Sequence, residues 1–468
     1  MYISDSNKKT NKSLGVFALV MINVIAIDSL RNLPSNAATG LHIIFYYFFA
    51  GIVFLLPCIL LTAELATNRP KTGGAYIWVR DAFGPQYGFL TIWLQWIYNV
   101  IWYPTILSFI AVNIAYLFNP DLVHSNAYMV PMIIGMFTLS TLANSFGMKL
   151  SSLVSTISAL IGTIIPMIII IILGIAWLDS TRPIAIEPTL THFLPTTLNG
   201  SHVAFLVVVF FSLMGFEMSS VHADEVKKPK SDYPKALVYS SLIVVVTMIL
   251  ASAAIAIVVP STQLNIVSGL DQAFELFLNS FHLKWLLPII IIFMIIGGFG
   301  GMSAWVIGPS KGLMVAAQDN CAPAIFGKAN KHGAPSTMLW AQWAVVVILC
   351  LLFVCFKSFN TWYWILSDLT AQLALLFYVL MFSAAIKLRY TTEYKADTFR
   401  IPGGYIGIWL TGLLGISACI FAIIVGLIPP TTMHITHVAW YESLLIGGCL
   451  IFSLVPLFIF KTKQRRSL

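Results

Sequence analysis

Residues 23–34 read Asn23-Val-Ile-Ala-Ile-Asp28-Ser29-Leu-Arg31-Asn-Leu-Pro34, a polar stretch inside a long apolar segment. Two charged side chains and a proline therefore fall near the middle of a segment that is long enough to cross a bilayer. Irregular backbone at membrane depth is tolerated only where it is buried in protein or lines a cavity. The stretch thus predicts a membrane-spanning helix that is broken in its middle.

The composition of the chain excludes an ordinary soluble protein. Of the 468 residues, 59% are hydrophobic and only 9% are charged, against about a quarter in soluble domains. Twelve membrane spans of about 20 residues would take up roughly 240 positions. The net charge of +8 is spread in short basic clusters between apolar runs and is not pooled in one patch, so we expect no nucleic-acid partner.

Apolar runs between charged or Pro/Gly-rich breaks predict an all-α membrane protein with twelve transmembrane helices. Unbroken runs of this length do not show the alternating pattern of membrane β-strands. The helices are expected at residues 14–39, 43–67, 88–118, 127–146, 150–178, 202–223, 235–259, 283–317, 335–356, 361–387, 406–428 and 438–460.

The basic residues predict the orientation of these helices. Of 26 Lys and Arg, 22 fall on one side of the predicted membrane, Arg31 lies inside the first span, and three lie on the other side: Arg182, Lys284 and Lys357. Lys and Arg are concentrated in cytoplasmic loops. We therefore expect both termini in the cytoplasm, with residues 1–13 as an N-terminal tail and 461–468 as a short basic tail.

A second break is predicted in the sixth span, where Gly215 and Glu217 interrupt an apolar helix. The first and sixth spans open two units of five helices, at residues 14–178 and 202–387, and helices 11 and 12 follow at 405–460. Because five is odd, the second unit must sit inverted relative to the first. The sequence therefore predicts a five-plus-five inverted repeat with helices 1 and 6 broken.

Matched breaks are where transporters place their substrates. The N–H groups freed by a break suit a carboxylate and the freed C=O groups suit an ammonium, so the breaks would bind a zwitterion such as an amino acid. The alternative is that Pro34 and Gly215 only kink two helices for packing.

Four charged residues lie at membrane depth, where charges are rare and usually functional. If residues 28–31 were helical, Asp28 and Arg31 would share a face and could neutralise each other; this pairing and direct ligand contact both stay open. Glu217 has no basic residue within reach on its own helix, and Asp368 in the tenth span is similar. Both carboxyls are candidates for proton coupling, with a structural hydrogen bond as the rival interpretation.

The eighth span has four glycines within residues 297–301, followed by Trp305. The glycines permit either a close helix approach or a hinge. For Trp305, stacking on a bound side chain, wedging a gate and packing in the core all stay open.

A series of motifs then resembles a known family. The chain is similar to the amino acid–polyamine–organocation superfamily and, within it, to the glutamate:GABA antiporter family, over nearly its whole length. The resemblance rests on the order and spacing of residues 29–34, 64–67, 73–79, 215–217, 224–229, 232–234, 305–312 and 399–404.

The resemblance implies a leucine-transporter-type fold in the inner membrane and sodium-independent exchange of amino acids by alternating access. It implies aromatic gates at Phe211 and Trp305, and a role of Glu217 in proton or gate coupling. Carried over by position, the residues that would meet the substrate's backbone groups are Ile27, Asp28, Ser29, Met214, Gly215 and Phe216.

Two departures from that family limit the substrate. The acid-resistance exchanger is expected to carry an acidic residue four positions before the tryptophan, where this chain has Gly301, and a long C-terminal plug, where this sequence stops at Leu468. Both argue against acid-gated autoinhibition and against glutamate. Asp28 adds a negative charge that would favour a neutral or cationic side chain on the substrate, provided that Arg31 does not neutralise it.

The leading hypothesis is therefore an amino-acid antiporter, and the alternative is a proton-coupled amino-acid symporter that uses Glu217 and Asp368. The histidines are scattered and no HExxH motif occurs, so we expect neither an enzyme nor a metal or cofactor. The expected partners are amino acids or their decarboxylation products and the lipid bilayer. A homodimer is among the oligomeric states left open.

Overall fold

The computed structural model describes residues 14–69, 73–146, 152–195, 205–220, 226–353, 359–391, 398–429 and 438–467. The predicted N-terminal tail at 1–13 lies outside these residues. Within the described ranges the regular elements are helices, and the β-structure is limited to one bridge between Leu14 and Val226.

The helices follow one another along the chain with short connections, and η marks a short 3-10 or π helix. In the first half they are α1 (Val16–Ile27), η1 (Leu30–Asn32), α2 (Leu33–Ala37), η2 (Gly40–His42), α3 (Ile43–Ala50), η3 (Gly51–Leu55), α4 (Leu56–Asn68), α5 (Gly74–Phe83), α6 (Pro85–Phe118), η4 (Pro120–His124), α7 (Asn126–Ser145), α8 (Ser152–Ala159), η5 (Leu160–Ile164), α9 (Ile165–Leu178) and α10 (Leu190–Phe193). In the second half they are α12 (Leu206–Ser212), α13 (Pro229–Val258), α14 (Gly269–Ser280), η7 (Lys284–Leu286), α15 (Leu287–Gln318), η8 (Ala324–Gly327), α16 (Ser336–Phe353), α17 (Phe359–Thr391), α18 (Gly404–Gly426) and α19 (Val438–Ser467).

Ten helical stretches of the described chain are long and apolar enough to cross a membrane, so the prediction of an all-α, multi-pass membrane protein is confirmed. The stretches are Val16–Ala37, Gly40–Asn68, Pro85–Phe118, Asn126–Ser145, Leu153–Leu178, Pro229–Val258, Lys284–Gln318, Asn360–Thr391, Gly404–Gly426 and Val438–Arg465.

The two other expected spans differ from these ten. The ninth corresponds to a shorter apolar helix, Ser336–Leu352. In the described part of the sixth, the α-helix α12 has seven residues, and residues 218–220 form a 3-10 turn. Parts of both expected spans, at 202–204, 221–223 and 354–356, lie outside the described residues. The count of twelve therefore stays a prediction.

The first span is interrupted where its polar residues lie. α1 ends at Ile27, Asp28 and Ser29 are not helical, and the chain turns helical again through η1 and α2. Pro34 stands in the first turn of α2, where its missing N–H costs no intrahelical hydrogen bond. The proline is thus accommodated because a new helix starts there.

The sixth span is interrupted after Ser212, where α12 ends. Gly215 follows with a φ of +115°, a region that residues with a Cβ rarely adopt. A Cβ on this residue would also lie 2.9 Å from the Trp305 ring. Backbone geometry and space therefore both require glycine at this position.

The glycines of the eighth span serve close packing in this structure. α15 runs unbroken through residues 297–301, so the glycines do not interrupt the helix. A Cβ on Gly297 would lie 2.2 Å from the carbonyl oxygen of Gly162 in η5, and one on Gly300 would lie 2.3 Å from Ser158 Cβ in α8. At these glycines α15 therefore packs closely against the span formed by α8 and η5.

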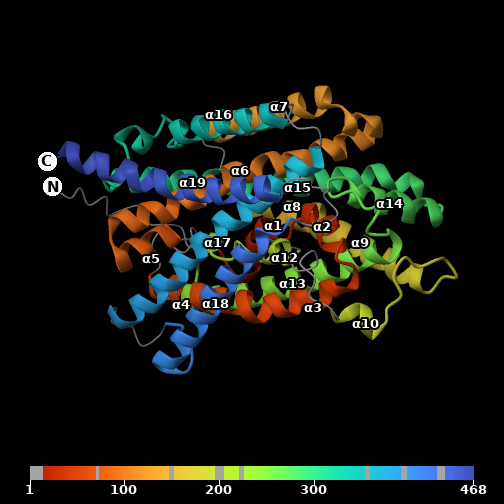
Figure 1. Ribbon diagram of the computed structural model, residues 1–468, viewed down its shortest axis with the longest axis horizontal. Coiled ribbons are helices and arrows are strands. Elements are labelled where there is room, and N and C mark those ends of the chain that lie inside the picture. Colours follow the sequence, from red (N-terminus) through yellow and green to blue (C-terminus); the bar gives the residue numbers. More distant parts are fainter. Residues whose placement is uncertain are drawn as a thin grey trace.

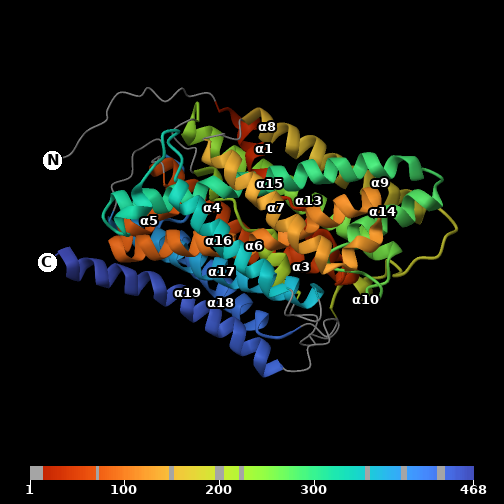
Figure 2. The ribbon, with the colours of Figure 1, turned by 90° about the horizontal axis from the view of Figure 1, so that it is seen from above.

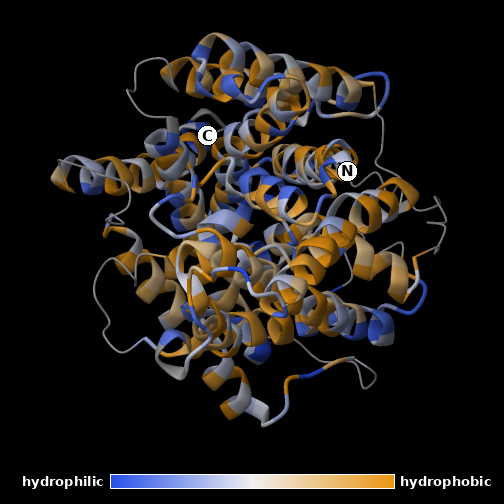
Figure 3. Cartoon of the chain, turned by 90° about the vertical axis from the view of Figure 1, so that its right-hand side faces the viewer, coloured by the Kyte–Doolittle hydropathy of each residue, from blue (hydrophilic) through white to orange (hydrophobic). Residues whose placement is uncertain are grey.

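The helices form a bundle with buried and peripheral members. Among the ten stretches, α6 is the most enclosed: 83% of the residues in its most apolar part are buried. In α19 the corresponding share is 17%. Figure 2 shows α19 along the outer edge of the bundle, and α7 and α16 pack together on one flank (Figure 1). Hydrophobic residues are prominent on the surrounding helices when the bundle is viewed from its end (Figure 3).

The bundle has two distinct ends (Figures 1 and 2). α5 and the C-terminal end of α19 lie at one end, and α10 and α14 lie at the other. At the first end Arg80 of α5 forms an ion pair with Asp319 at 2.6 Å. α19 continues as a helix beyond its predicted end at residue 460, and Lys463 donates to the Ala322 carbonyl at 2.6 Å.

Candidate functional site

The two helix breaks meet at Trp305. A Cβ placed on Gly215 would lie 2.9 Å from the Trp305 ring and 3.1 Å from Ile27 Cγ1. Ile27 at the first break and Trp305 therefore both lie beside the second break. The Trp305 indole donates to the Ala26 carbonyl at 2.9 Å, and the Tyr103 hydroxyl donates to the Trp305 carbonyl at 3.1 Å. In this conformation Trp305 therefore packs at the junction of the breaks.

Two pockets flank the break in the first span, with empty volumes of about 340 and 330 Å³. The two pockets are similar in size but differ in the residues that line them. The Arg31 pocket is lined by Arg31, Asn32, Ser35, Val207, Val208, Phe211, Trp364, Ser367, Asp368 and Ala371. The Asp28 pocket is lined by Ile25, Ala26, Asp28, Ser29, Leu30, Trp102, Ile106, Phe109, Thr163, Gly297, Gly298 and Gly301.

Asp28 is buried and has one hydrogen-bond donor. The Thr247 hydroxyl of α13 donates to its Oδ2 at 2.9 Å, and its Oδ1 is buried without a partner. An unsatisfied carboxylate oxygen in a pocket can accept a hydrogen bond from a ligand.

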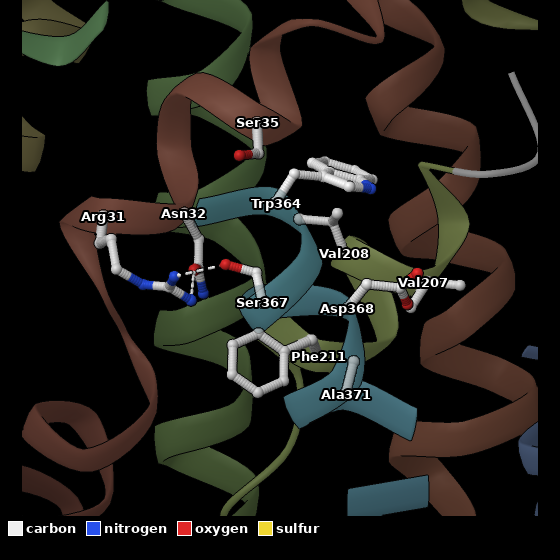
Figure 4. A pocket seen from close by; sticks show the side chains of 10 residues that line it. All are labelled: Arg31, Asn32, Ser35, Val207, Val208, Phe211, Trp364, Ser367, Asp368 and Ala371. Carbon is white, nitrogen blue, oxygen red and sulfur yellow. Dashed lines mark hydrogen bonds between the residues drawn. The ribbon is translucent and has the colours of Figure 1, made fainter. Parts of the chain in front are cut away.

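Arg31 is 3% exposed and is surrounded by neutral acceptors. Its Nη2 donates to Asn32 Oδ1 at 2.8 Å, and its guanidinium carbon lies 5.4 Å from the centre of the Phe211 ring. Its Nη1 contacts three hydroxyls, at distances of 3.0, 3.1 and 3.2 Å: Thr105, Tyr363 and Ser367. Figure 4 shows the guanidinium beside Asn32 and Ser367, with Phe211 on the same wall of the pocket.

The pairing of Asp28 with Arg31 that a helix would allow is not formed. The i,i+3 relationship requires continuous helix, but α1 ends at Ile27. The two side chains therefore face different pockets, and the described chain provides Arg31 with no carboxylate at ion-pair distance.

Glu217 is held from the tenth span. The Tyr378 hydroxyl of α17 donates to Glu217 Oε2 and accepts the Gly215 N–H at 2.7 Å. Glu217 Oε1 is buried without a partner. The tyrosine thus joins the carboxyl to the backbone of the break.

Asp368 is held from the last helix. The Tyr441 hydroxyl of α19 donates to Asp368 Oδ2 and accepts the Trp364 indole N–H at 3.2 Å, while Oδ1 is buried without a partner. Figure 4 shows the Asp368 carboxyl on the side of the pocket away from Arg31.

Some of the other predicted site residues line a pocket, and others line neither. Ser29 lines the Asp28 pocket and Phe211 lines the Arg31 pocket, so Phe211 and Trp305 lie at different places. Four residues of the carried-over set line neither pocket: Ile27, Met214, Gly215 and Phe216. The side chains of Ile27, Met214 and Phe216 are buried.

Sequence reasoning missed the partners of the buried charges: Thr247, Tyr378 and Tyr441. Each lies on another helix, far along the chain, and a lone Thr or Tyr in an apolar run carries no local signal.

Within the described ranges no group of three or more His, Cys, Asp or Glu side chains is placed to hold a metal ion.

Comparisons with known proteins agree on one family. The family model described as "Amino acid permease" matches residues 14–450. An uncharacterized transporter of Legionella pneumophila is 49% identical over 447 residues, covering 96% of each chain. A glutamate/gamma-aminobutyrate antiporter of Lactococcus lactis is 26% identical, covering 98% of this chain and 92% of that one. A probable agmatine/putrescine antiporter of the same species is 24% identical, covering 97% and 95%.

Proposed function

The chain belongs to the amino acid permease family, and we propose that it is a sodium-independent amino-acid antiporter that works by alternating access. The observation that carries the proposal is the junction of two helix breaks, where Ile27 and Gly215 meet at Trp305. Two pockets beside the first break each contain a charged residue with an unsatisfied buried atom, Asp28 and Arg31. The two Lactococcus relatives, both antiporters by name, support exchange. The names of the relatives indicate a transporter and not an enzyme.

We infer a twelve-helix architecture for this antiporter. The units at 14–178 and 202–387 form the inverted repeat, helices 11 and 12 follow at 405–460, and the protein lies in the inner membrane. The clustering of Arg80, the loop after α15 and Lys463 at one end of the bundle supports cytoplasmic termini, because basic residues mark the cytoplasmic side.

In this proposal the substrate's backbone groups bind at the breaks, at Ile27, Asp28 and Ser29 and at Met214, Gly215 and Phe216. In the present conformation Trp305 fills the space between the breaks, and the Tyr378 hydroxyl takes the Gly215 N–H. Substrate binding there requires Trp305 to move, which agrees with its proposed role as a gate together with Phe211.

The test is counterflow in liposomes. Purified protein should take up a labelled amino acid from a screen of the twenty amino acids, GABA and agmatine only when an exchangeable amino acid is preloaded inside. Equally fast uptake into empty vesicles would contradict exchange.

Proton-coupled symport is the second candidate, because Glu217 and Asp368 each keep a buried oxygen without a partner inside the membrane. A symporter would accumulate substrate in empty vesicles when a pH gradient is imposed, and Glu217→Gln would remove that drive. Antiport predicts that the gradient has no effect in empty vesicles.

A further inference from the structure

Arg31 is a buried cation without a counter-charge. It is 3% exposed, every one of its hydrogen-bond acceptors is neutral, and the described chain offers no ion-pair partner. A buried charge left unpaired is costly, so such groups are usually compensated by another charge. Among the residues that the structure describes, none supplies this compensating charge, so a ligand in the pocket is the candidate source.

Arg31 keeps donors that no acceptor of the described chain uses. A guanidinium has five N–H donors. Nη2 has one acceptor, Asn32, and Nε is buried with none, so the Nε–H and one Nη2–H stay without a partner. Two guanidinium donors can bind the two oxygens of one carboxylate.

The neighbours of Arg31 keep this site in place. Nη1 is anchored by hydroxyls from α6 and α17, among them Thr105 and Ser367. The guanidinium carbon lies 5.4 Å from the centre of the Phe211 ring and 5.5 Å from that of the Tyr363 ring. Such anchoring lowers the ordering cost of binding.

We propose that Arg31 is the carboxylate-binding residue of a substrate subsite in the Arg31 pocket. This inference rests on the proposed amino-acid transport and assigns the charge that the pocket recognises. Asp368 lies across the same pocket, so a ligand that carries both an ammonium and a carboxylate complements the two charged residues. The sequence-based expectation that Asp28 favours a neutral or cationic side chain was conditional on Arg31 not neutralising it, and in the structure the two residues line separate pockets.

The carboxylate has two possible sources in an amino acid, the α-carboxylate or a side-chain carboxylate, and four probes separate them. Glutamate has both groups and glutamine has only the α-carboxylate. GABA keeps only the carboxylate that was in the glutamate side chain, and agmatine has no carboxylate.

The experiment measures the affinity of each probe by inhibition of counterflow and by ligand-induced thermal stabilisation of the full-length protein. Arg31→Gln should weaken carboxylate probes about 10- to 100-fold, the range for losing hydrogen bonds to a charged group, and leave agmatine unchanged. Equal losses for glutamate and glutamine with GABA unchanged identify the α-carboxylate. Losses for glutamate and GABA with glutamine unchanged identify the side-chain carboxylate.

Arg182→Gln is the matched control. Arg182 also lies over two aromatic rings, 5.3 Å from Trp177 and 4.3 Å from Phe281, but lines neither pocket. This variant should bind all probes as the wild type does. If Arg31→Gln does not fold, Arg31→Lys decides, because it keeps the charge but loses the paired donors and should weaken carboxylate probes several-fold.

The inference is overturned if a folded Arg31 variant binds carboxylate probes normally, or loses agmatine as strongly as glutamate. Its failure is distinguishable from failure of the proposed function. A wild-type protein that exchanges no amino acid removes the proposed function, whereas a wild type that exchanges amino acids with Arg31 variants unaffected removes only this inference.

Discussion

The Tyr378 hydroxyl accepts the Gly215 N–H at 2.7 Å, so the tenth span holds the backbone of the break in the sixth. The same hydroxyl donates to Glu217. One side chain therefore links a buried carboxyl to the N–H that the proposed mechanism offers to substrate, and a change at the carboxyl has a direct path to the break.

Tyr378→Phe removes both hydrogen bonds and keeps the ring. We expect counterflow to fall about tenfold or more, because the loss leaves a buried N–H and a carboxyl oxygen unsatisfied, at about 1–3 kcal/mol for each group. The folded yield, measured by fluorescence-detected gel filtration, should fall less than the transport rate.

Tyr128→Phe is the control for this prediction. The Tyr128 hydroxyl donates to the Ala111 carbonyl at 2.9 Å and lines neither pocket. Transport by Tyr378→Phe at the rate of Tyr128→Phe would show that the link to the break has no functional role.

Gly215→Ala should abolish transport. Its φ of +115° strains any residue with a Cβ, and the new methyl group would lie 2.9 Å from Trp305. Backbone strain alone costs about 1–3 kcal/mol. Gly135→Ala in α7, where the added Cβ meets no neighbouring side chain or other element within 4 Å, should leave transport unchanged and should not lower the melting temperature, because alanine favours a helix more than glycine does. An active Gly215→Ala would mean that the break relaxes freely.

The sequence predicted the fold class and the position of the break in the first span, because both depend on local composition. Asp28, Arg31 and Pro34 stand out in an apolar run and mark the interruption by themselves. Helices α5 and α14 were not predicted, because both are too short and too polar to be recognised as membrane spans.

The site was predicted only in part, because its geometry depends on contacts between distant helices. Asp28 and Arg31 were recognised as unusual, but their separation into two pockets follows from the end of α1 at Ile27. The partners of Glu217 and Asp368 are tyrosines 161 and 73 residues away along the chain. A single sequence gives no signal for such pairs.

Arg389 and Glu64 form a buried ion pair at 2.5 Å, with side chains 0% and 2% exposed. Arg389 also donates to the Ile401 carbonyl at 3.0 Å, and Glu64 accepts the Ile401 N–H at 2.7 Å. Arg389→Met should lower stability by about 3–5 kcal/mol, because it removes the cation that compensates the buried Glu64 carboxylate. Thermal unfolding followed by tryptophan fluorescence measures the loss.

The exposed counterpart of this pair is Arg69 with Asp81, where the side chains are 20% and 24% exposed. Asp81→Asn should cost less than about 1 kcal/mol, as surface pairs do. In the double variant Glu64→Gln with Arg389→Met, part of the lost stability should return, since no buried charge is then left over. A double variant as unstable as the sum of the single ones would contradict this account.

Asp271 in the outer helix α14 predicts a pH dependence of stability. It is fully buried, neither carboxyl oxygen has a hydrogen-bond partner, and burial, with Glu275 nearby, raises its pKa from 3.8 to about 8. Because the folded state then holds the proton more tightly than the unfolded chain, the stability linked to protonated Asp271 is complete below about pH 4 and is lost as the pH rises toward 8. The melting temperature of the wild type should fall between pH 5 and 8.

Asp271→Asn cannot ionise, so the part of the fall that Asp271 causes should disappear and the variant should melt above the wild type at pH 8. Asp121→Asn, which changes an exposed acid in η4, should follow the wild-type profile. If Asp271→Asn kept the full wild-type slope between pH 5 and 8, the pH dependence would have to come from other groups. A pH dependence that is lost in Asp271→Asn but kept in Asp121→Asn is assigned to the buried carboxyl of Asp271 in α14.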